Sequence, residues 1–254
     1  MLEVKGLSKS YRGLPAIDRV SFCVSAGEIV GYVGPNGSGK STTVKIITGL
    51  LEPNDGQVLF EGESIRNNLQ RYRAAFGYVP EEAHVYTHLS GLEYLQLVGR
   101  LRNMPEALID LKANKFLALF GLESWRYSPI SLYSKGMKQR ILIAAALLHD
   151  PELLIFDEAQ SGLDVSNALL FRYLLCALAA RGKAILYISH VLELVEKTCE
   201  HIVVIYQGRI VADDSVAILR DRLQQPDLEG IFSELVQQED MESRARDIAA
   251  VLAL

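Results

Sequence analysis

Short runs of apolar residues alternate along the chain with longer segments in which apolar and polar residues recur at helical spacing. Continuous runs rich in Val, Ile, Leu and Phe are typical of strands that are buried on both faces of a parallel sheet. The pattern predicts strands at residues 2–7, 17–24, 29–33, 57–60, 76–79, 153–157, 184–188, 201–206 and 209–212. It predicts helices from about residue 39 and at 62–73, 90–100, 105–120, 134–148 and 165–180. Strands alternating with helices predict an α/β fold with a mainly parallel sheet and an antiparallel β edge.

One region in the middle of the chain lacks the strand pattern. Ser90 begins a capping box at the start of one predicted helix, and a second helical segment follows. We therefore predict a helical insertion over about 82–129, and the long helix that comes next extends the helical region to about 82–150. Residues 1–215 are predicted to form one domain, and residues 216–254 a helical C-terminal extension.

The composition argues against several classes of protein. With 254 residues, of which 49% are hydrophobic, the chain can form a full core rather than remain disordered. The net charge of −5 argues against a broad nucleic-acid surface, so we expect no nucleic-acid partner. The three cysteines form no C-x-x-C pair, which favours a reducing compartment. No apolar run approaches the ~20 residues of a membrane span, and the N-terminus lacks the apolar region of a signal peptide, so we expect a cytoplasmic location.

A glycine-rich loop between a predicted strand and a predicted helix carries the most specific chemical signal. It matches G-x-x-x-x-G-K-S/T, a loop that cradles nucleotide phosphates. Glycines allow backbone conformations in which several N–H groups point at phosphate oxygens, and the N-terminus of the next helix adds positive charge. Lys40 would reach the β- and γ-phosphates, and the Ser41 hydroxyl would bind Mg²⁺. The predicted phosphate site consists of Gly34, Pro35, Asn36, Gly37, Ser38, Gly39, Lys40, Ser41 and Thr42.

Three further polar side chains follow predicted strands directly. Asp157 and Glu158 close one apolar run, and His190 comes just after another. The carboxyl ends of parallel strands share one edge of a sheet, and α/β proteins bind ligands there. We predict that Asp157 supports Mg²⁺, that Glu158 activates the attacking water, and that His190 reaches the γ-phosphate.

Two other residues have both a structural and a functional interpretation. Tyr11, in a predicted loop, could stack on adenine, but taken alone it is interpreted as an ordinary surface tyrosine. Ser134 would cap a buried helix, and taken alone that interpretation is favoured.

In their order along the chain, these motifs resemble those of the nucleotide-binding domains of ATP-binding cassette (ABC) transporters. The resemblance covers about residues 2–215. The phosphate loop is common to many NTPases, whereas a signature-like segment followed by an acidic strand end, Ser-Gly-Leu-Asp and a histidine is specific to this family. The matching segments are Tyr11, GPNGSGKST at 34–42, a strand ending at Glu81, YSKGM at 133–137, LLIFDE at 153–158, SGLD at 161–164 and His190.

The resemblance implies a P-loop NTPase core with ATP and Mg²⁺ as ligands. It implies that Tyr11 stacks on adenine and that Ser41, Glu81 and Asp157 form the metal site. Lys40, Glu158 and His190 would be the catalytic residues.

The resemblance also implies a dimer of two cassettes arranged head to tail, as a homodimer or a heterodimer. In this family the signature contacts the nucleotide that is bound by a second cassette. Ser134 and Gly136 would therefore contact the γ-phosphate of the partner's nucleotide, and Asp164 would lie at the interface.

The chain departs from the family pattern at several positions. Glu81 stands where the family usually has Gln, and a third carboxylate near Mg²⁺ would bind the metal more tightly or change how hydrolysis is coupled to a partner. The signature is YSKGM rather than LSGGQ, so Lys135 adds a positive charge that either reaches the partner's phosphates or does not. Ala159-Gln160 replaces the usual Pro-Thr after Glu158.

The function implied by the resemblance is that of an ATPase subunit of an exporter-type transporter whose permease is a separate chain. The protein would lie at the inner face of the cell membrane through that permease. The insertion that begins at Glu81 and includes Tyr86, Leu89 and Tyr94 is the expected contact. The alternative is a soluble ABC ATPase that drives an assembly reaction such as iron–sulfur cluster assembly. ABC proteins of nucleic acids or ribosomes, and P-loop kinases, fit the charge and the motifs less well.

Overall fold

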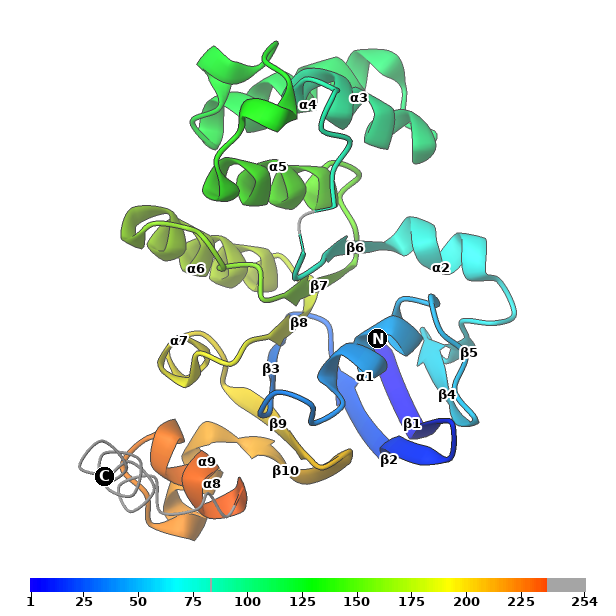
Figure 1. The fold of residues 1–254 in the computed structure, drawn as a ribbon, viewed down its shortest axis with the longest axis vertical. Helices are drawn as coiled ribbons and strands as arrows, with labels where there is room; N and C mark the ends of the chain where they lie inside the picture. The colour runs from blue at the N-terminus through cyan, green and yellow to red at the C-terminus, as the bar shows by residue number, and fades with distance from the viewer. Residues whose placement is uncertain (83, 237–254) are drawn as a thin grey trace, which may run out of the picture.

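The computed structural model describes residues 1–82 and 84–236, which form two sheets and the helices that cover them (Figure 1). Residues 237–254, the last part of the predicted C-terminal extension, lie outside the described residues. The larger sheet contains β3 (Ile29–Val33), β6 (Phe76–Val79), β7 (Leu153–Asp157), β8 (Ala184–Ile188), β9 (His201–Tyr206) and β10 (Arg209–Ser215). The smaller sheet contains β1 (Leu2–Tyr11), β2 (Leu14–Val24), β4 (Asp55–Phe60) and β5 (Glu63–Ser64).

The two sheets differ in the direction of their strands. The larger one has the order β10-β9-β3-β8-β7-β6, and all pairs in it are parallel except β10 with β9. Gln207 and Gly208, with φ of 47° and 78°, form the tight turn of that one antiparallel pair. The smaller sheet is antiparallel with the order β2-β1-β4-β5. The predicted fold class, with a mainly parallel sheet and an antiparallel edge, is confirmed.

The central strands are buried on both faces because their apolar residues alternate between two hydrophobic clusters. In β7, Leu153 and Ile155 face one cluster while Leu154 and Phe156 face the other. The first cluster also holds residues of α1 (Lys40–Ile47) and of the smaller sheet. The second holds residues of α5 (Lys135–Leu147) and α6 (Val165–Ala180). The large sheet is thus the middle layer of the molecule.

Several helices begin at residues whose side chains cap them. Ser90 forms a capping box with Glu93, and the hydroxyl of Ser134 and the carboxylate of Asp164 cap α5 and α6. Figure 1 shows α3 and α4 together at one end of the molecule, beyond α5. The helices not yet given bounds are α2 (Leu69–Ala75), α3 (Gly91–Leu101), α4 (Glu106–Leu119), α7 (Leu192–Glu196), α8 (Val216–Leu223) and α9 (Leu228–Val236), and there are 3₁₀ turns at Glu123–Trp125 and Ile130–Leu132.

Two predictions of secondary structure are wrong in part. The first strand continues to Tyr11, which pairs with Leu14, so Tyr11 lies at a strand end and not in a loop. The segment predicted as a helix at 62–73 begins instead with β5, which pairs with β4. The helix starts only after Asn68, whose side chain accepts a hydrogen bond from the backbone N–H of Arg71. Pairing with an existing strand outweighs the weak helical preference of this polar stretch.

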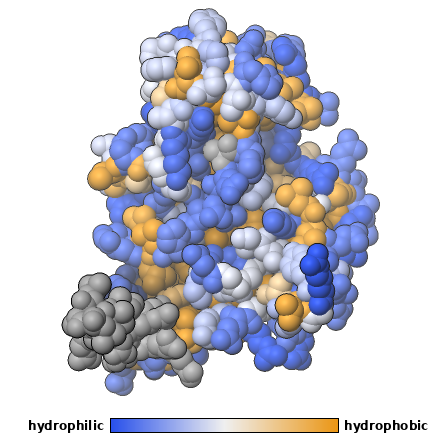
Figure 2. All heavy atoms as spheres, in the orientation of Figure 1, coloured by the Kyte–Doolittle hydropathy of each residue, from blue (hydrophilic) through white to orange (hydrophobic). Residues whose placement is uncertain are grey.

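The surface is mainly polar, with some hydrophobic exceptions (Figure 2). Val165 and Leu169 on α6 reach the surface, and so do Leu101 at the end of α3 and Leu50 after α1. None of the helices among the described residues combines the length and the apolar character that crossing a membrane requires.

Candidate nucleotide site

The phosphate loop leaves β3 and enters α1 through backbone positions that only glycine fits. A Cβ on Gly34 would lie 2.3 Å from the carbonyl oxygen of Ile205. Gly39 has a φ of +111°, and its Cβ would lie 2.8 Å from the carbonyl oxygen of Ala16. The loop is therefore packed against β9 and β2, which fixes the first turn of α1 at the end of the sheet.

Lys40 is the first residue of α1, and its ammonium lies over the phosphate loop. Its Nζ donates hydrogen bonds to the carbonyl oxygens of Gly34 (2.6 Å) and Pro35 (3.0 Å). Burial lowers the pKa of Lys40, and nearby carboxylates, Glu158 first, oppose that shift. The first backbone N–H groups of the helix have no acceptor within the helix. The ammonium of Lys40 and these backbone amides together provide hydrogen-bond donors for an anion.

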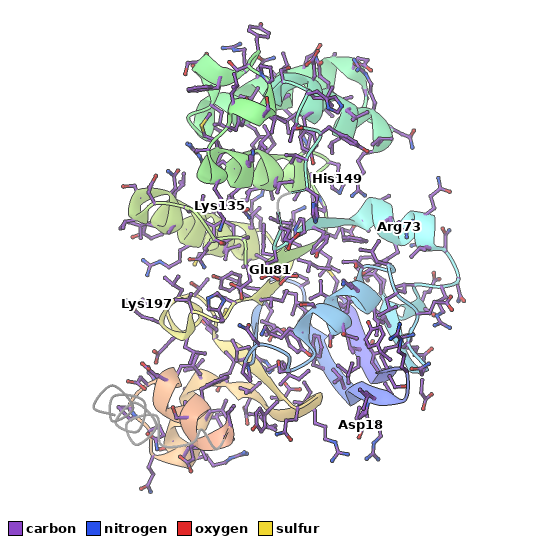
Figure 3. All side chains as sticks on the ribbon, viewed as in Figure 1. Asp18, Arg73, Glu81, Lys135, His149 and Lys197 are labelled. Atoms are coloured by element: carbon purple, nitrogen blue, oxygen red, sulfur yellow. The ribbon has the colours of Figure 1, made fainter. Side chains whose placement is uncertain are left out.

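A cavity of about 280 Å³ lies where the carboxyl ends of β3, β6, β7 and β8 meet. It brings together most of the residues that the sequence predicts for phosphate, metal and catalysis, and Glu81, which lines it, is labelled in Figure 3. Ala16 was missed, because a small apolar residue in a strand gives no chemical signal. The lining consists of Ala16, Asn36, Gly37, Gly39, Lys40, Ser41, Thr42, Glu81, Asp157, Glu158 and His190.

Asp157 is the most buried carboxylate of this cavity, with only 6% of its surface exposed. Burial, together with Glu81 and Glu158, raises its pKa to about 6, while Lys40 and the hydroxyl of Tyr78 act in the opposite direction. The sequence gives no signal that Tyr78 is near Asp157, because Tyr78 has the pattern of an ordinary strand residue. The cavity therefore holds more negative charge than its one lysine balances.

Glu158 follows β7 in a left-handed conformation, with a φ of 50°, and its N–H donates to the carbonyl of Ile188 on the neighbouring strand. Its Oε1 lies 2.7 Å from Nδ1 of His190. Glu158 is largely buried, whereas His190 is exposed. His190 thus holds the carboxylate of Glu158 by a hydrogen bond, and both residues line the cavity.

The donor set fits Mg²⁺ but does not form a closed metal cage. Among residues 1–82 and 84–236, no three His, Cys, Asp or Glu side chains are grouped to hold an ion by themselves. Mg²⁺ usually takes one or two carboxylates and completes its shell with water and substrate phosphates. Asp157, Glu81 and the hydroxyl of Ser41 line one cavity with excess negative charge, and this arrangement suits such a site.

Several predicted residues lie outside the cavity lining. Tyr11, 46% exposed, stands at the end of β1. Ser134, Gly136 and Asp164 lie at the beginnings of α5 and α6. A hydrogen bond from the backbone of Asn167 lowers the pKa of Asp164. Within one chain these three residues are not part of the cavity.

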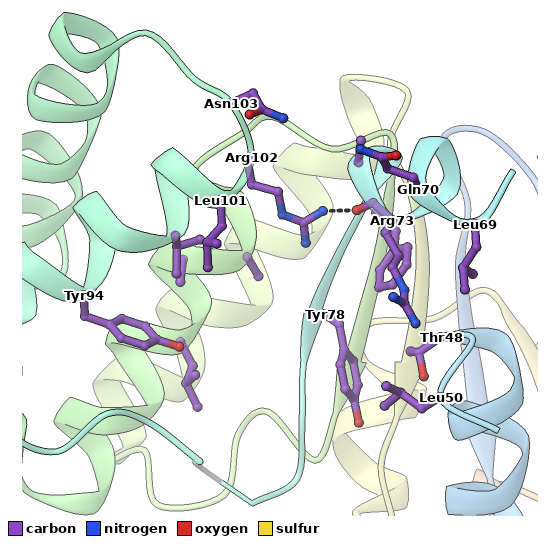
Figure 4. A pocket seen from close by; sticks show the side chains of 16 residues that line it. Thr48, Leu50, Leu69, Gln70, Arg73, Tyr78, Tyr94, Leu101, Arg102 and Asn103 are labelled. Carbon is purple, nitrogen blue, oxygen red and sulfur yellow. Dashed lines mark hydrogen bonds between the residues drawn. The ribbon is translucent and has the colours of Figure 1, made fainter.

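A second concavity, of about 750 Å³, lies between α2, β6 and the end of α3 (Figure 4). Its lining is mainly apolar and includes the exposed Leu50 and Leu101 on opposite sides. Arg102 donates a hydrogen bond to the carbonyl oxygen of Arg73 across it. No acidic residue is among its described lining residues. Tyr78 lines this groove, and its hydroxyl influences the pKa of Asp157 in the cavity, so Tyr78 lies between the groove and the cavity.

Comparison with known proteins decides the family. A family model described as ABC transporter matches residues 17–161, which contain the phosphate loop, the signature-like segment and Asp157. The chain belongs to the ABC transporter family.

Individual relatives align with more of this chain than the family model does. The structure of an ATP-binding subunit of an ABC transporter is 34% identical, covers 92% of this chain and 99% of that one, and superimposes with a TM-score of 0.87. A dimeric ATP-binding cassette in a post-hydrolysis state, bound to ADP and Pi, is 25% identical, covers 85% of this chain and 99% of its own, and gives a TM-score of 0.79. The Nod factor export ATP-binding protein I of Ralstonia nicotianae is 35% identical over 84% of this chain and 66% of its own length. The chain is an ATP-binding, ATP-hydrolysing subunit of an ABC transporter.

Proposed function

We propose that this ABC transporter subunit powers an exporter, with its permease on a separate chain. The observation that carries the proposal is the apolar groove beside the nucleotide cavity, with Tyr78 between them. Export as the direction is supported by the related Nod factor export protein. Through its permease, the protein would lie at the cytoplasmic face of the membrane.

The polar residues at the cavity, together with Tyr11 beside it, have roles in this proposal. Lys40 and the loop amides bind the phosphates, and Mg²⁺ held by Ser41, Asp157 and Glu81 would neutralise the charge that develops on the phosphoryl oxygens. Glu158 accepts a proton from the attacking water, and His190 holds Glu158 in place and reaches the γ-phosphate. Tyr11 stacks on adenine at the outer edge of the loop.

Two cassettes are proposed to combine head to tail, because one chain contains only half of each complete site. Ser134, Gly136 and Asp164 would serve the nucleotide of the partner. None of the three lines the cavity of its own chain, which supports this arrangement, as does the dimeric form of a related cassette. We further propose that residues 1–215 act as the cassette and that residues 216–254 form an extension to it.

The groove is proposed to receive a short amphipathic helix of the permease. Leu50, Leu101 and Tyr94 offer apolar contacts, and the two arginines would favour a carboxylate on the incoming helix. Of the contact residues predicted from the sequence, Tyr94 lines the groove, whereas Tyr86 and Leu89 do not. A movement of the residues that line the groove would be transmitted to Asp157 through Tyr78.

A detergent pull-down tests the proposal against its alternative. The tagged chain is expressed in its native cells, the cells are fractionated, and whatever co-purifies in mild detergent is identified. We expect a polytopic membrane protein in the membrane fraction. Recovery only with soluble partners would instead favour an assembly ATPase, such as one for iron–sulfur clusters, and would contradict the exporter proposal.

A further inference from the structure

A side-chain contact that the roles above leave unused joins the signature segment (residues 133–137) to the turn after Glu158 (residues 159–164). The ammonium of Lys135 donates a hydrogen bond of 2.7 Å to the hydroxyl of Ser161. Lys135 lies between α5 and α6 in Figure 3. Its side chain therefore turns toward its own chain, onto a segment close to the catalytic carboxylate.

The two segments also touch through their backbones. Gly162 has a φ of +86°, and a Cβ there would lie 2.7 Å from Cγ of Lys135. A Cβ on Gly136 would lie 2.7 Å from the carbonyl oxygen of Gly162. Both glycines are thus needed for close approach. Because the contact has a backbone part and a side-chain part, neither segment shifts freely without the other.

Local helix formation does not explain a lysine at this position. Lys135 is the first residue of α5, where the helix dipole disfavours a cation, and the first turn contains no acidic residue. No carboxylate of the described residues forms an ion pair with Lys135. The stem of the side chain packs on Gly162 and its ammonium binds Ser161, so a tertiary contact offsets the local disadvantage.

The contact continues on both sides into the rest of the fold. The N–H of Ser161 donates to the carbonyl oxygen of Glu158 at 2.9 Å. On the other side, Arg140 of α5 donates to the carbonyl oxygens of Gly136 (3.4 Å) and Phe120 (2.6 Å), which follows α4. A continuous series of contacts therefore leads from the helical region through the signature segment to Glu158.

We propose that Lys135 is a positioning residue that couples the signature segment to the Glu158 turn through Ser161. The proposal rests on the proposed dimer, in which the signature of one chain contacts the nucleotide of its partner. Engagement of that nucleotide would shift the signature segment, and Lys135 would pass the shift to the carboxylate that serves the chain's own nucleotide. The two sites of the dimer would thereby act together.

The kinetic test uses substitutions that remove only the hydrogen bond. Lys135→Met keeps most of the apolar stem but has no donor, and Ser161→Ala removes the acceptor. We expect each to lower kcat about threefold to tenfold, the range for losing one hydrogen bond. KM for ATP should change little, the Hill coefficient should fall toward one, and the double variant should be no worse than either single one. Lys138→Met, which removes a charge one turn away, should behave as wild type.

The opposite role for Lys135, contact with the partner's phosphates, predicts a different set of results. If Lys135 contacts the partner's phosphates, Lys135→Met raises KM and weakens ATP-dependent dimerisation, while Ser161→Ala behaves as wild type. That outcome, or fully additive losses in the double variant, would overturn the coupling role.

Hydrogen exchange in the nucleotide-free protein separates this proposal from the proposed function. Amides of residues 159–164 should exchange faster in Lys135→Met and in Ser161→Ala than in wild type or Lys138→Met. Unchanged exchange in both variants rejects the contact as a restraint. A wild-type protein that neither dimerises nor hydrolyses ATP would contradict the proposed function, yet its exchange would still report on this contact.

Discussion

The nucleotide cavity and the groove beside it differ in almost every physical property. The cavity is small, lies at the carboxyl ends of four parallel strands, and is lined by three carboxylates and one lysine. The groove is larger and mainly apolar, and it is formed by helices and the edge strand. Tyr78 belongs to the lining of the groove, and its hydroxyl influences the pKa of Asp157 in the cavity.

This difference indicates that ATP hydrolysis belongs to the cavity and that coupling to a partner belongs to the groove. Charged groups in a buried site need fixed positions, which a sheet edge provides, whereas a docking surface needs apolar area and adjustable helices. Changes in the cavity should therefore act on hydrolysis and stability, and changes in the groove only on the partner.

Glu158→Gln should lower ATP hydrolysis by roughly 10²–10⁴-fold, because an amide does not accept the proton of the attacking water. Binding of ATP and ATP-dependent dimerisation should remain, since the shape of the side chain is kept. Phosphate release and size-exclusion chromatography with ATP measure the two effects. Glu152→Gln, at the opposite end of β7, is the matched control. Normal phosphate release from Glu158→Gln would exclude Glu158 as the base.

Asp157→Asn should abolish hydrolysis yet make the folded chain more stable at pH 8. The pKa of Asp157 is raised to about 6 in the folded state, so folding becomes less favourable as the pH rises from about 4 to about 6 and stays so above. Removing the charge should add up to about 3 kcal/mol to the free energy of unfolding at pH 8.

Thermal unfolding without divalent ions, at pH 8 and at about pH 4, measures this gain, which should shrink at the lower pH. Glu152→Gln should show no comparable gain. A lower melting temperature for Asp157→Asn at pH 8 would mean that the raised pKa is not a source of instability.

Leu101→Glu should weaken the association with the permease about tenfold, because it places a charge on the apolar lining of the groove. The ATPase activity of the isolated chain should not change. Leu101 is 71% exposed, so the fold should tolerate the substitution. Leu119→Glu on α4 is the control, since Leu119 is 76% exposed and lies outside the groove. Equal losses for both leucines would argue against the groove as the docking site.

Tyr78→Phe should have the smallest effect, a reduction of about twofold to tenfold in permease-stimulated hydrolysis, because only one hydroxyl is removed. The stimulated and basal rates of the reconstituted transporter would be compared. Tyr94→Phe removes a hydroxyl from the groove without touching Asp157 and should change neither rate. A fall in the basal rate alone would place Tyr78 in the chemistry rather than in coupling.

The sequence by itself determined the chemistry at the strand ends. The phosphate loop was predictable because its glycines, Lys40 and Ser41 are neighbours in the chain. Asp157, Glu158 and His190 were predictable for a related reason, since each follows a continuous apolar run. Parallel strands then bring the ends of such runs to one edge of the sheet.

Only the tertiary structure decided which distant residues touch these groups. Ala16 lines the cavity, the hydroxyl of Tyr78 influences the pKa of Asp157, and Lys135 binds Ser161 across 26 positions of sequence. The sequence also left open whether Lys135 serves a partner or its own chain. Such contacts depend on how α5 and α6 pack on the large sheet, and no local pattern of apolar and polar residues records that packing.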